Sequence, residues 1–289
     1  MMDLACPLPQ SEAFERTCRS IGVDVARYET SDGTCLVQSR KLPVLGDFHL
    51  VSRGPVAETN AGFETLTRDI CRNLKGIMVV NAPAGDAKTG GMKFAKGAEL
   101  AILDLAAPTE MRAGLQQKWR NQLNKAESAA LEIRVEPLDL KKHHWFLEAE
   151  TKQQSARGYK SYPSGFLLAY AAANKNQAML YSARIVGRPV AGMLVLKHGA
   201  MATYQAGVTT PDGRKYCAHN RLLWTMMCDL QSEGTVRLDL GRADLSSGLK
   251  RFKRGCGAHI ETLSGSFLFH HWFSPRQRGL RVNAPQAPV

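Results

Sequence analysis

Apolar positions along the chain recur at two different periods, and the two periods alternate. Recurrence every three or four residues predicts amphipathic helices at 10–26, 61–74, 109–130, 139–155, 166–175 and 218–234. Continuous or alternating apolar runs beside Gly, Pro, Asn and Asp predict strands at 34–40, 48–56, 75–83, 98–105, 131–137, 178–187, 188–199, 200–210, 236–242 and 259–273. Helices and strands that alternate along the whole chain predict an α/β (α+β) protein.

The order of these elements is similar in two parts of the chain. Residues 1–135 and residues 136–275 each combine helices with a run of strands and close on further strands. This repeated order predicts two lobes with those boundaries. Residues 276–289, which contain Pro and Arg, are expected to form a basic tail that frays.

Composition places the chain among globular proteins and gives it a positive charge. Of its 289 residues, 44% are hydrophobic and 22% are charged, which argues against disorder. The 38 Lys and Arg exceed the 26 Asp and Glu by 12, which favours partners that carry phosphate. The longest apolar run that could suggest a membrane span, "FLLAYAAA" at 166–173, is too short to cross a bilayer. We therefore expect a cytoplasmic protein without a transmembrane segment.

Cysteine and histidine usage gives no sign of a disulfide framework or a metal. The seven cysteines are scattered and never form a Cys-x-x-Cys motif, which is typical of reduced thiols. The pairs His143-His144 and His270-His271 have no third ligand at a suitable spacing, so no metal is expected. Cys256 lies two residues from Arg254, so it is either a reactive thiol or a small core side chain.

The segment 238–258, "LDLGRADLSSGLKRFKRGCGA", joins an apolar run to a dense group of cations. Five cations occur between Arg242 and Arg254, with glycines around them. We expect a glycine-punctuated hairpin that is either a solvated turn or a grip for an anion. In an extended segment, Arg251 and Lys253 would share one face, while Lys250, Phe252 and Arg254 would share the other.

The second half has the element order of the GNAT acyltransferase fold. In that fold, a strand meander precedes a helix whose N-terminus receives a pyrophosphate. The family loop is similar to Val208, Pro211 and Arg214 here, although Val208 and Pro211 are one residue too far apart. Its two glycines are absent, and the bulkier Tyr216, Cys217 and His219 crowd the site. This departure weakens the expectation of an acetyl-CoA donor.

A narrower resemblance covers most of residues 50–270. The chain is similar to the FemAB/FemX-like branch of the GNAT superfamily in four stretches: "RGPV" (53–56), "LQQKWRNQLNKAE" (115–127), "ARGYKSY" (156–162) and "DLGRADLSSGLKRFKRGCGA" (239–258). The last stretch keeps the family's most specific pattern as Asp239, Gly241, Gly248, Phe252, Lys253, Gly257 and Ala258. The resemblance implies two tandem GNAT-like lobes, each a mixed, mostly antiparallel sheet flanked by helices.

The resemblance also implies an activity. Such enzymes move an amino acid from aminoacyl-tRNA to the amine of a peptidoglycan precursor. We therefore expect an acyltransferase that uses acyl-CoA or aminoacyl-tRNA as co-substrate, binds no cofactor tightly, and makes peripheral contact with the inner membrane surface. Two alternatives stay open: a CoA-dependent N-acetyltransferase of a small amine, and a non-catalytic GNAT-like protein that binds RNA or the envelope.

Site residues follow from the matching motifs. Lys253 is expected to stabilise the oxyanion, and Asp239 either orients a lysine, acts as base, or forms a structural pair. Arg157 resembles the family arginine that contacts the acceptor's diphosphate, with Lys160 assisting. The expected carrier-facing rim consists of Arg242, Lys250, Arg251 and Arg254. The expected donor loop consists of Arg214, Ala218 and His219, where His219 is either a base or a polar residue at a helix start.

Overall fold

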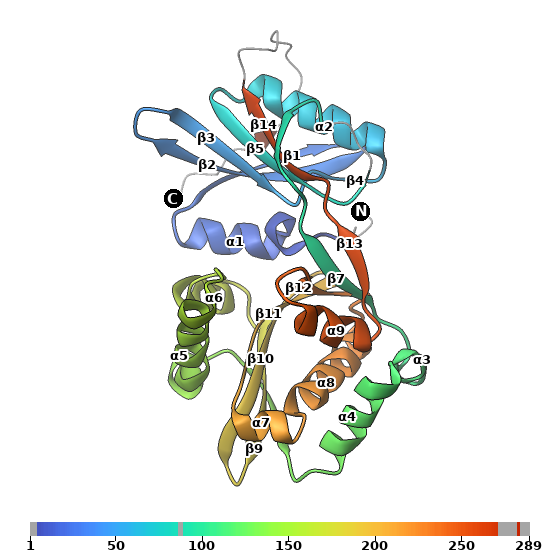
Figure 1. Cartoon of the computed structure of the whole chain (residues 1–289). Helices are drawn as coiled ribbons and strands as arrows, with labels where there is room; N and C mark the ends of the chain where they lie inside the picture. Colours follow the sequence, from blue (N-terminus) through green and yellow to red (C-terminus); the bar gives the residue numbers. More distant parts are fainter. Residues whose placement is uncertain (1–4, 86–88, 271–281, 284–289) are drawn as a thin grey trace. The chain divides into compact units, whose positions relative to one another are not determined.

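The structure, a computed structural model, describes residues 5–85, 89–270 and 282–283. The chain forms two compact units, and each contains one β-sheet. Unit 1 consists of Met1–Leu8 and Leu100–Ile260, and unit 2 consists of Pro9–Glu99 and Glu261–Val289 (Figure 1). Among the described residues, no helix combines the length and apolar character needed to span a bilayer.

Unit 1 is built on a seven-stranded sheet with the strand order β13-β7-β12-β11-β10-β9-β8. Its elements in chain order are β7 (Glu99–Asp104), α3 (Pro108–Gly114), α4 (Gln117–Glu127), β8 (Glu132–Pro137), α5 (Leu140–Arg157), α6 (Ser164–Ala173), β9 (Ala178–Ile185), β10 (Arg188–His198), β11 (Met201–Thr209), α7 (Pro211–Lys215), α8 (Ala218–Ser232), β12 (Arg237–Arg242), α9 (Ser247–Gly255) and β13 (His259–Thr262). Strands β11 and β12 run parallel, whereas β10 is antiparallel to both β9 and β11.

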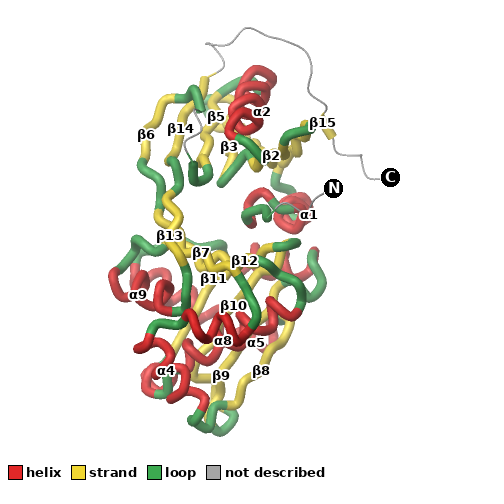
Figure 2. Tube along the Cα trace, turned by 90° about the vertical axis from the view of Figure 1, so that its right-hand side faces the viewer, coloured by secondary structure: helices red, strands yellow, loops and turns green. Residues whose placement is uncertain are grey.

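Helices cover both faces of this sheet. Helices α5 and α6 lie against one face, and α8, backed by α4, lies against the other (Figures 1 and 2). The interior strand β10 is therefore buried on both sides. Met193 packs in the core beside α8. A side chain at the preceding position, Gly192, would point to the opposite face and collide with Phe146 of α5. This alternation is the ordinary period of a strand.

The parallel pair β11 and β12 separates partway along its length. The two strands pair only from Met201 to Thr203 on β11 and from Arg237 to Asp239 on β12. Just beyond, the register between β10 and β11 shifts, which leaves Gln205 as an extra residue. Such a bulge bends and twists its strand. The second half of β11 is therefore not paired with β12, and a cavity opens beside it.

Unit 2 holds an eight-stranded sheet with the order β15-β1-β2-β3-β5-β14-β6, and β4 pairs with β2. Its elements are the 3-10 helix η1 (Leu8–Gln10), α1 (Glu12–Ser20), β1 (Asp24–Thr30), β2 (Gly33–Leu42), β3 (Gly46–Ser52), β4 (Val56–Ala57), α2 (Asn60–Asn73), β5 (Ile77–Ala82), β6 (Met92–Ala95), β14 (Gly265–His270) and β15 (Val282–Asn283). Helix α2 packs Phe63, Leu66 and Ile70 onto one face, while α1 lies on the other.

The two mixed sheets flanked by helices confirm the expected fold class, but the units divide at other residues than 135 and 136. Strand β7 pairs with β12 through Leu103 and Leu238, so the chain from residue 100 packs with the later half. Strand β14 pairs with β5 through Phe267 and Val80 and so returns to the earlier half. The sequence does not show these exchanges because long-range pairing leaves no local pattern. The expected tail, 276–289, lies outside the described residues except for β15.

Three segments differ locally from the sequence expectation. The first helix ends at Ser20, and Val25 belongs to β1. The helix expected at 109–130 is two helices, because Leu115 and Gln116 are extended and the Gln116 N–H donates to the Gly255 carbonyl at 3.0 Å. The cationic segment was expected to form a hairpin, and it forms the helix α9 instead. His271, which completes the second histidine pair, lies outside the described residues.

Candidate functional site

Helix α9 positions the lysine that the sequence singles out. The Ser246 hydroxyl accepts a hydrogen bond from the Leu249 N–H, which is a standard N-cap for a helix beginning at Ser247. Helical spacing places Leu249, Phe252 and Lys253 on one side, since residues three and four apart are neighbours. The extended alternation expected from the sequence is therefore wrong.

Lys253 is buried although it carries an amine. Its side chain is 4% exposed, and Nζ donates to the backbone carbonyl of Arg242 at 2.8 Å. Burial lowers the pKa of Lys253 to about 8, while the negative charges of Asp239 and Asp244 act in the opposite direction. Among the described residues, the Arg242 carbonyl is the one hydrogen-bond acceptor recorded for this amine. A protonated Lys253 therefore has N–H groups left for a ligand.

Asp239 lies at the point where β12 bends away. Its side chain is 1% exposed, and its Oδ1 accepts the Gly241 N–H at 2.7 Å. Gly241 has a φ of +74°, which a side chain would strain, and a Cβ there would stand 4.0 Å from Lys253 Nζ. Asp239 thus shapes the turn beside the lysine and supplies a nearby negative charge. Its expected role as a base stays a prediction.

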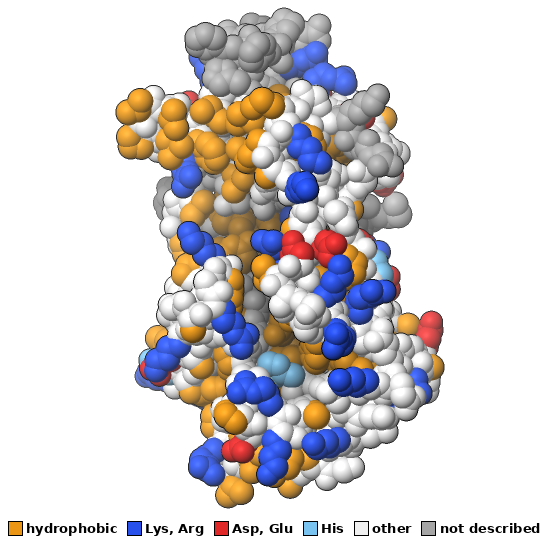
Figure 3. Space-filling view, in the orientation of Figure 1, with side chains coloured by type: hydrophobic (Ala, Val, Ile, Leu, Met, Phe, Trp, Pro, Cys, Tyr) orange, Lys and Arg blue, Asp and Glu red, His pale blue; other side chains and the backbone are white. Residues whose placement is uncertain are grey.

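The divergence of β11 from β12 forms a cavity of about 290 Å³ in unit 1. Its polar lining consists of Gln153, Arg157, Tyr204, Arg214, His219 and Lys253. Apolar side chains from β10, α8, β12 and α9 complete the wall. The face of unit 1 shown in Figure 3 carries many Lys and Arg side chains and few acidic ones. The cavity therefore combines an apolar wall with several positive groups, which suits an anionic or polarised acyl ligand.

His219 lines this cavity in a defined tautomer. Its Nε2 lies 2.9 Å from the backbone carbonyl of Val208. A carbonyl oxygen can only accept, so Nε2 carries the hydrogen, and Nδ1 of the neutral ring is an acceptor. Burial lowers the pKa of His219, which keeps the ring neutral near pH 7. The hydrogen bond to Val208 therefore directs Nε2 of His219 toward β11.

A buried carboxylate beside the cavity escaped the sequence prediction. Glu150 on α5 is 3% exposed and accepts hydrogen bonds from Tyr159 Oη at 3.0 Å and from Gln153 and Gln154 at 3.2 and 3.3 Å. Burial raises the pKa of Glu150 against these hydrogen bonds. The usable signal was its place in α5, four residues after the apolar Phe146, where a buried side chain is expected.

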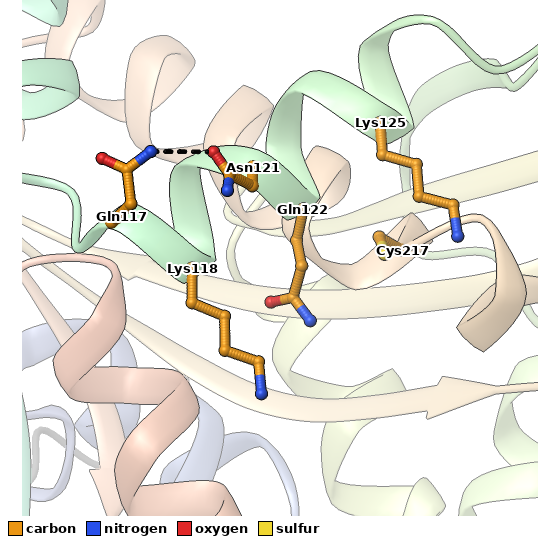
Figure 4. A pocket seen from close by; sticks show the side chains of 6 residues that line it. All are labelled: Gln117, Lys118, Asn121, Gln122, Lys125 and Cys217. Carbon is orange, nitrogen blue, oxygen red and sulfur yellow. Dashed lines mark hydrogen bonds between the residues drawn. The ribbon is translucent and has the colours of Figure 1, made fainter.

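A separate groove of about 550 Å³ lies between α4 and the start of α8. Figure 4 shows its lining: Gln117, Lys118, Asn121, Gln122, Lys125 and Cys217. Two ammonium groups and several side-chain amides thus face one hollow at the N-terminus of a 15-residue helix. Because free N–H groups and the helix dipole favour anions at this end, the groove suits a phosphate-bearing ligand.

The remaining expected site residues lie elsewhere on unit 1. Arg242 forms an ion pair with Asp244, with both nitrogen–oxygen distances at 2.9 Å. The Ala218 side chain is fully buried in the core, so only its backbone is available to a donor. Among the cations expected at the site, those that line neither described hollow are Lys160, Arg242, Lys250, Arg251 and Arg254.

The thiols take no part in either hollow except for Cys217. None of the seven cysteines, which all lie within the described residues, forms a disulfide. Cys256 is 1% exposed, and burial raises its pKa to about 12, so it is a core side chain and not a reactive thiol. Within the described ranges, no group of three His, Cys, Asp or Glu side chains is arranged to hold a metal ion.

Comparisons with known proteins bear on this geometry. Residues 113–254, which contain both hollows, match the family model described as "Acetyltransferase (GNAT) domain". No curated protein sequence matches the chain. Among solved structures, the crystal structure of FemX is similar with a TM-score of 0.75 at 13% sequence identity, and 93% of each chain is covered.

Two further solved structures share the fold at lower scores. The C-terminal domain of a putative lysylphosphatidylglycerol synthetase from Agrobacterium fabrum has a TM-score of 0.59 at 16% identity, covering 90% of this chain and 88% of that one. The L-PGS from Bacillus licheniformis has a TM-score of 0.56 at 16% identity, covering 92% and 93%. These findings confirm the resemblance drawn from the sequence: residues 113–254 match the GNAT acetyltransferase family model, and the chain shares the fold of FemX.

Proposed function

We propose that this chain transfers an acyl or aminoacyl group from an activated carrier, acyl-CoA or aminoacyl-tRNA, to an amine. The observation that carries the proposal is the Lys253 ammonium, which is buried at the cavity with one recorded acceptor among the described residues. A fixed cation in a water-poor site stabilises a developing oxyanion far better than a solvated cation does.

The chemistry of transfer fits the groups around the cavity. The amine nitrogen attacks the acyl carbon, the carbonyl oxygen becomes negative, and the bond to the carrier's oxygen or sulfur then breaks. Lys253 stabilises the negative oxygen through its N–H groups. The amine loses one proton, and the leaving oxygen or sulfur gains one. His219 Nδ1 is an acceptor for that proton, and water or the carrier itself is the alternative.

Binding of the two substrates is divided between the two hollows. Lys118 and Lys125 in the groove are suited to the phosphates of a carrier, and the start of α8 adds its N–H groups. Arg157 at the cavity is suited to phosphate on the acceptor, because a guanidinium binds phosphate oxygens in pairs. A peptidoglycan precursor with a diphosphate and a free amine would meet this requirement.

A second candidate is N-acetylation of a small amine with acetyl-CoA. The match of residues 113–254 to the acetyltransferase family model favours it. Against it, Cys217 and His219 stand where the family loop has small residues. A third candidate, a non-catalytic protein that binds RNA or the envelope, rests on the net charge of +12 alone.

One experiment separates these candidates. Acetyl-CoA, aminoacyl-tRNA and uncharged tRNA are titrated separately, and labelled acyl transfer to a peptidoglycan nucleotide precursor and to small amines is followed. The proposal predicts that a carrier binds and that its label appears on an amine. Acetyl-CoA binding without tRNA binding would favour the second candidate. Equal binding of both tRNA forms with no transfer to any amine would contradict the proposal and favour the third.

A further inference from the structure

The hydrogen-bonded cluster around Glu150 reaches the cavity through a single side chain. Glu150 and Tyr159 do not line the cavity, whereas Gln153 does. Gln153 Nε2 donates to the Gly207 carbonyl at 3.0 Å and contacts Tyr159 Oη at 2.9 Å as well as Glu150. The cluster therefore connects α5 to the second half of β11, which is paired with β10 but not with β12.

The orientation of the Gln153 amide is fixed by these partners. The Gly207 carbonyl can only accept a hydrogen bond, and the Glu150 carboxylate does the same. The amide nitrogen must therefore face this cluster, and the amide oxygen must point away from it. Gln153 Oε1 has no hydrogen bond recorded among the described residues. It is thus an acceptor with no partner in the described part of the chain, on a side chain that lines the cavity.

We propose that Gln153 Oε1 accepts a hydrogen bond from the N–H of the attacking amine and so aligns it with the acyl carbon, while Glu150 and Tyr159 are positioning residues that hold the Gln153 amide. This inference rests on the proposed acyl transfer. A nucleophilic amine has both N–H groups and one lone pair. Fixing an N–H therefore directs the lone pair, and alignment of this kind contributes strongly to rate.

The geometry of the cavity supports this division of roles. Gln153 comes from α5 on one wall and Lys253 comes from α9 on another. An amine held by Gln153 and an acyl oxygen held by Lys253 would be gripped by different elements of unit 1. Glutamine does not take up a proton, so Gln153 orients the amine and leaves the proton to another acceptor.

The test replaces Gln153 with methionine, which is similar in length but makes no amide hydrogen bond. Transfer to the best amine acceptor and hydrolysis of the carrier without acceptor are both measured, using whichever of acetyl-CoA and aminoacyl-tRNA is active. We expect kcat/KM for the amine to fall roughly tenfold or more. Carrier hydrolysis and the carrier's KM should stay within about twofold, because water needs no alignment by Gln153.

Gln154→Met is the matched control. Gln154 is the adjacent glutamine and also donates to Glu150, but it does not line the cavity. Both variants lose a hydrogen bond to the same carboxylate, so a merely structural effect would appear in both. We expect only Gln153→Met to change the ratio of transfer to hydrolysis. Thermal unfolding of both variants reports the structural part separately.

Tyr159→Phe provides a second variant in case Gln153→Met does not fold. It removes the Tyr159 hydroxyl, which contacts Gln153 Nε2 at 2.9 Å, a contact that Gln154 does not make, and it should produce a smaller change of the same kind in the transfer-to-hydrolysis ratio. An active wild-type protein whose transfer kinetics are unchanged in Gln153→Met would overturn this inference and leave the proposed function intact. A wild-type protein that transfers no acyl group would overturn both.

Discussion

At the scale of single residues, burial decides what the cations do. Lys253 and its neighbours Arg251 and Arg254 have the same sign of charge, yet only Lys253 is removed from water. A charge in a poorly solvated site acts more strongly on a nearby ligand and loses its proton more readily. The same burial that fits Lys253 for oxyanion stabilisation therefore also makes it sensitive to pH.

Transfer should fall as pH rises through about 8. The protonated lysine is the stabilising form, and the pKa of Lys253 is lowered to about 8, so the active fraction decreases above that pH. The measurement is a pH–rate profile at saturating carrier. A rate that instead rises through this range would indicate that neutral Lys253 acts as a base.

Arg157→Ala should weaken binding of the acceptor more than turnover. Arg157 lines the cavity, and the loss of paired contacts to phosphate should raise the acceptor KM by roughly tenfold with a smaller loss in kcat. Lys152→Ala is the control, since Lys152 lies on the same helix and pairs with Glu148 at 2.7 Å outside the cavity. An equal change in both variants would point to a general charge effect.

At the scale of elements, the close contact between Gly255 and Trp119 fixes the position of α9. A side chain at Gly255 would approach Trp119 of α4 to 2.8 Å, and the Gly255 carbonyl accepts the Gln116 N–H between α3 and α4. The break between α3 and α4, in the middle of the helix expected at 109–130, therefore places Trp119 against α9. Helix α9 in turn holds Lys253 at the cavity.

Gly255→Ala should destabilise unit 1 by about 1–3 kcal/mol, the usual cost of overpacking. Gly248→Ala is the control on the same helix, since a side chain there meets nothing within 4 Å and should be neutral or stabilise by up to ~1 kcal/mol. Urea denaturation measures both. Equal free energies of unfolding for the two variants would contradict the packing argument.

The sequence predicted the individual helices and strands better than it predicted which of them pair or pack together. The fold class, most strands and the motif around Lys253 were predictable, because apolar periodicity and short motifs are local. The hairpin assigned to α9 was wrong because glycines at 248 and 255 suggested turns, whereas Ser246 caps a helix there. Glu150 was missed because its partners Tyr159 and Gln153 become visible only once α5 is placed against β11.

At the scale of the whole molecule, the net charge of +12 should act on the binding of large anions. Lysines such as Lys118 and Lys125 lie in the groove, where they can displace counterions from a bound phosphate chain. A net charge of this sign would raise the affinity for a nucleic-acid carrier without choosing which acyl group the carrier bears. Specificity therefore depends on the cavity.

Binding of tRNA should accordingly weaken at least tenfold between ~50 and ~200 mM salt. The double variant Lys118→Gln, Lys125→Gln should show a shallower salt dependence, since two phosphate contacts are lost. Filter binding at several salt concentrations measures both slopes. Identical slopes in the variant and the wild type would remove the groove from the binding surface.

The central claim is that the Lys253 ammonium stabilises the oxyanion, and Lys253→Met tests it most directly. Folding should survive, because burial of the charged lysine costs the folded state stability: this cost builds up as pH falls from the ordinary pKa of 10.5 to the lowered pKa of about 8, and it is fully present below about 8. With saturating carrier and acceptor, the single-turnover rate of transfer should fall by roughly 10²–10³-fold. Transfer by a folded Lys253→Met protein at the wild-type rate would contradict the claim.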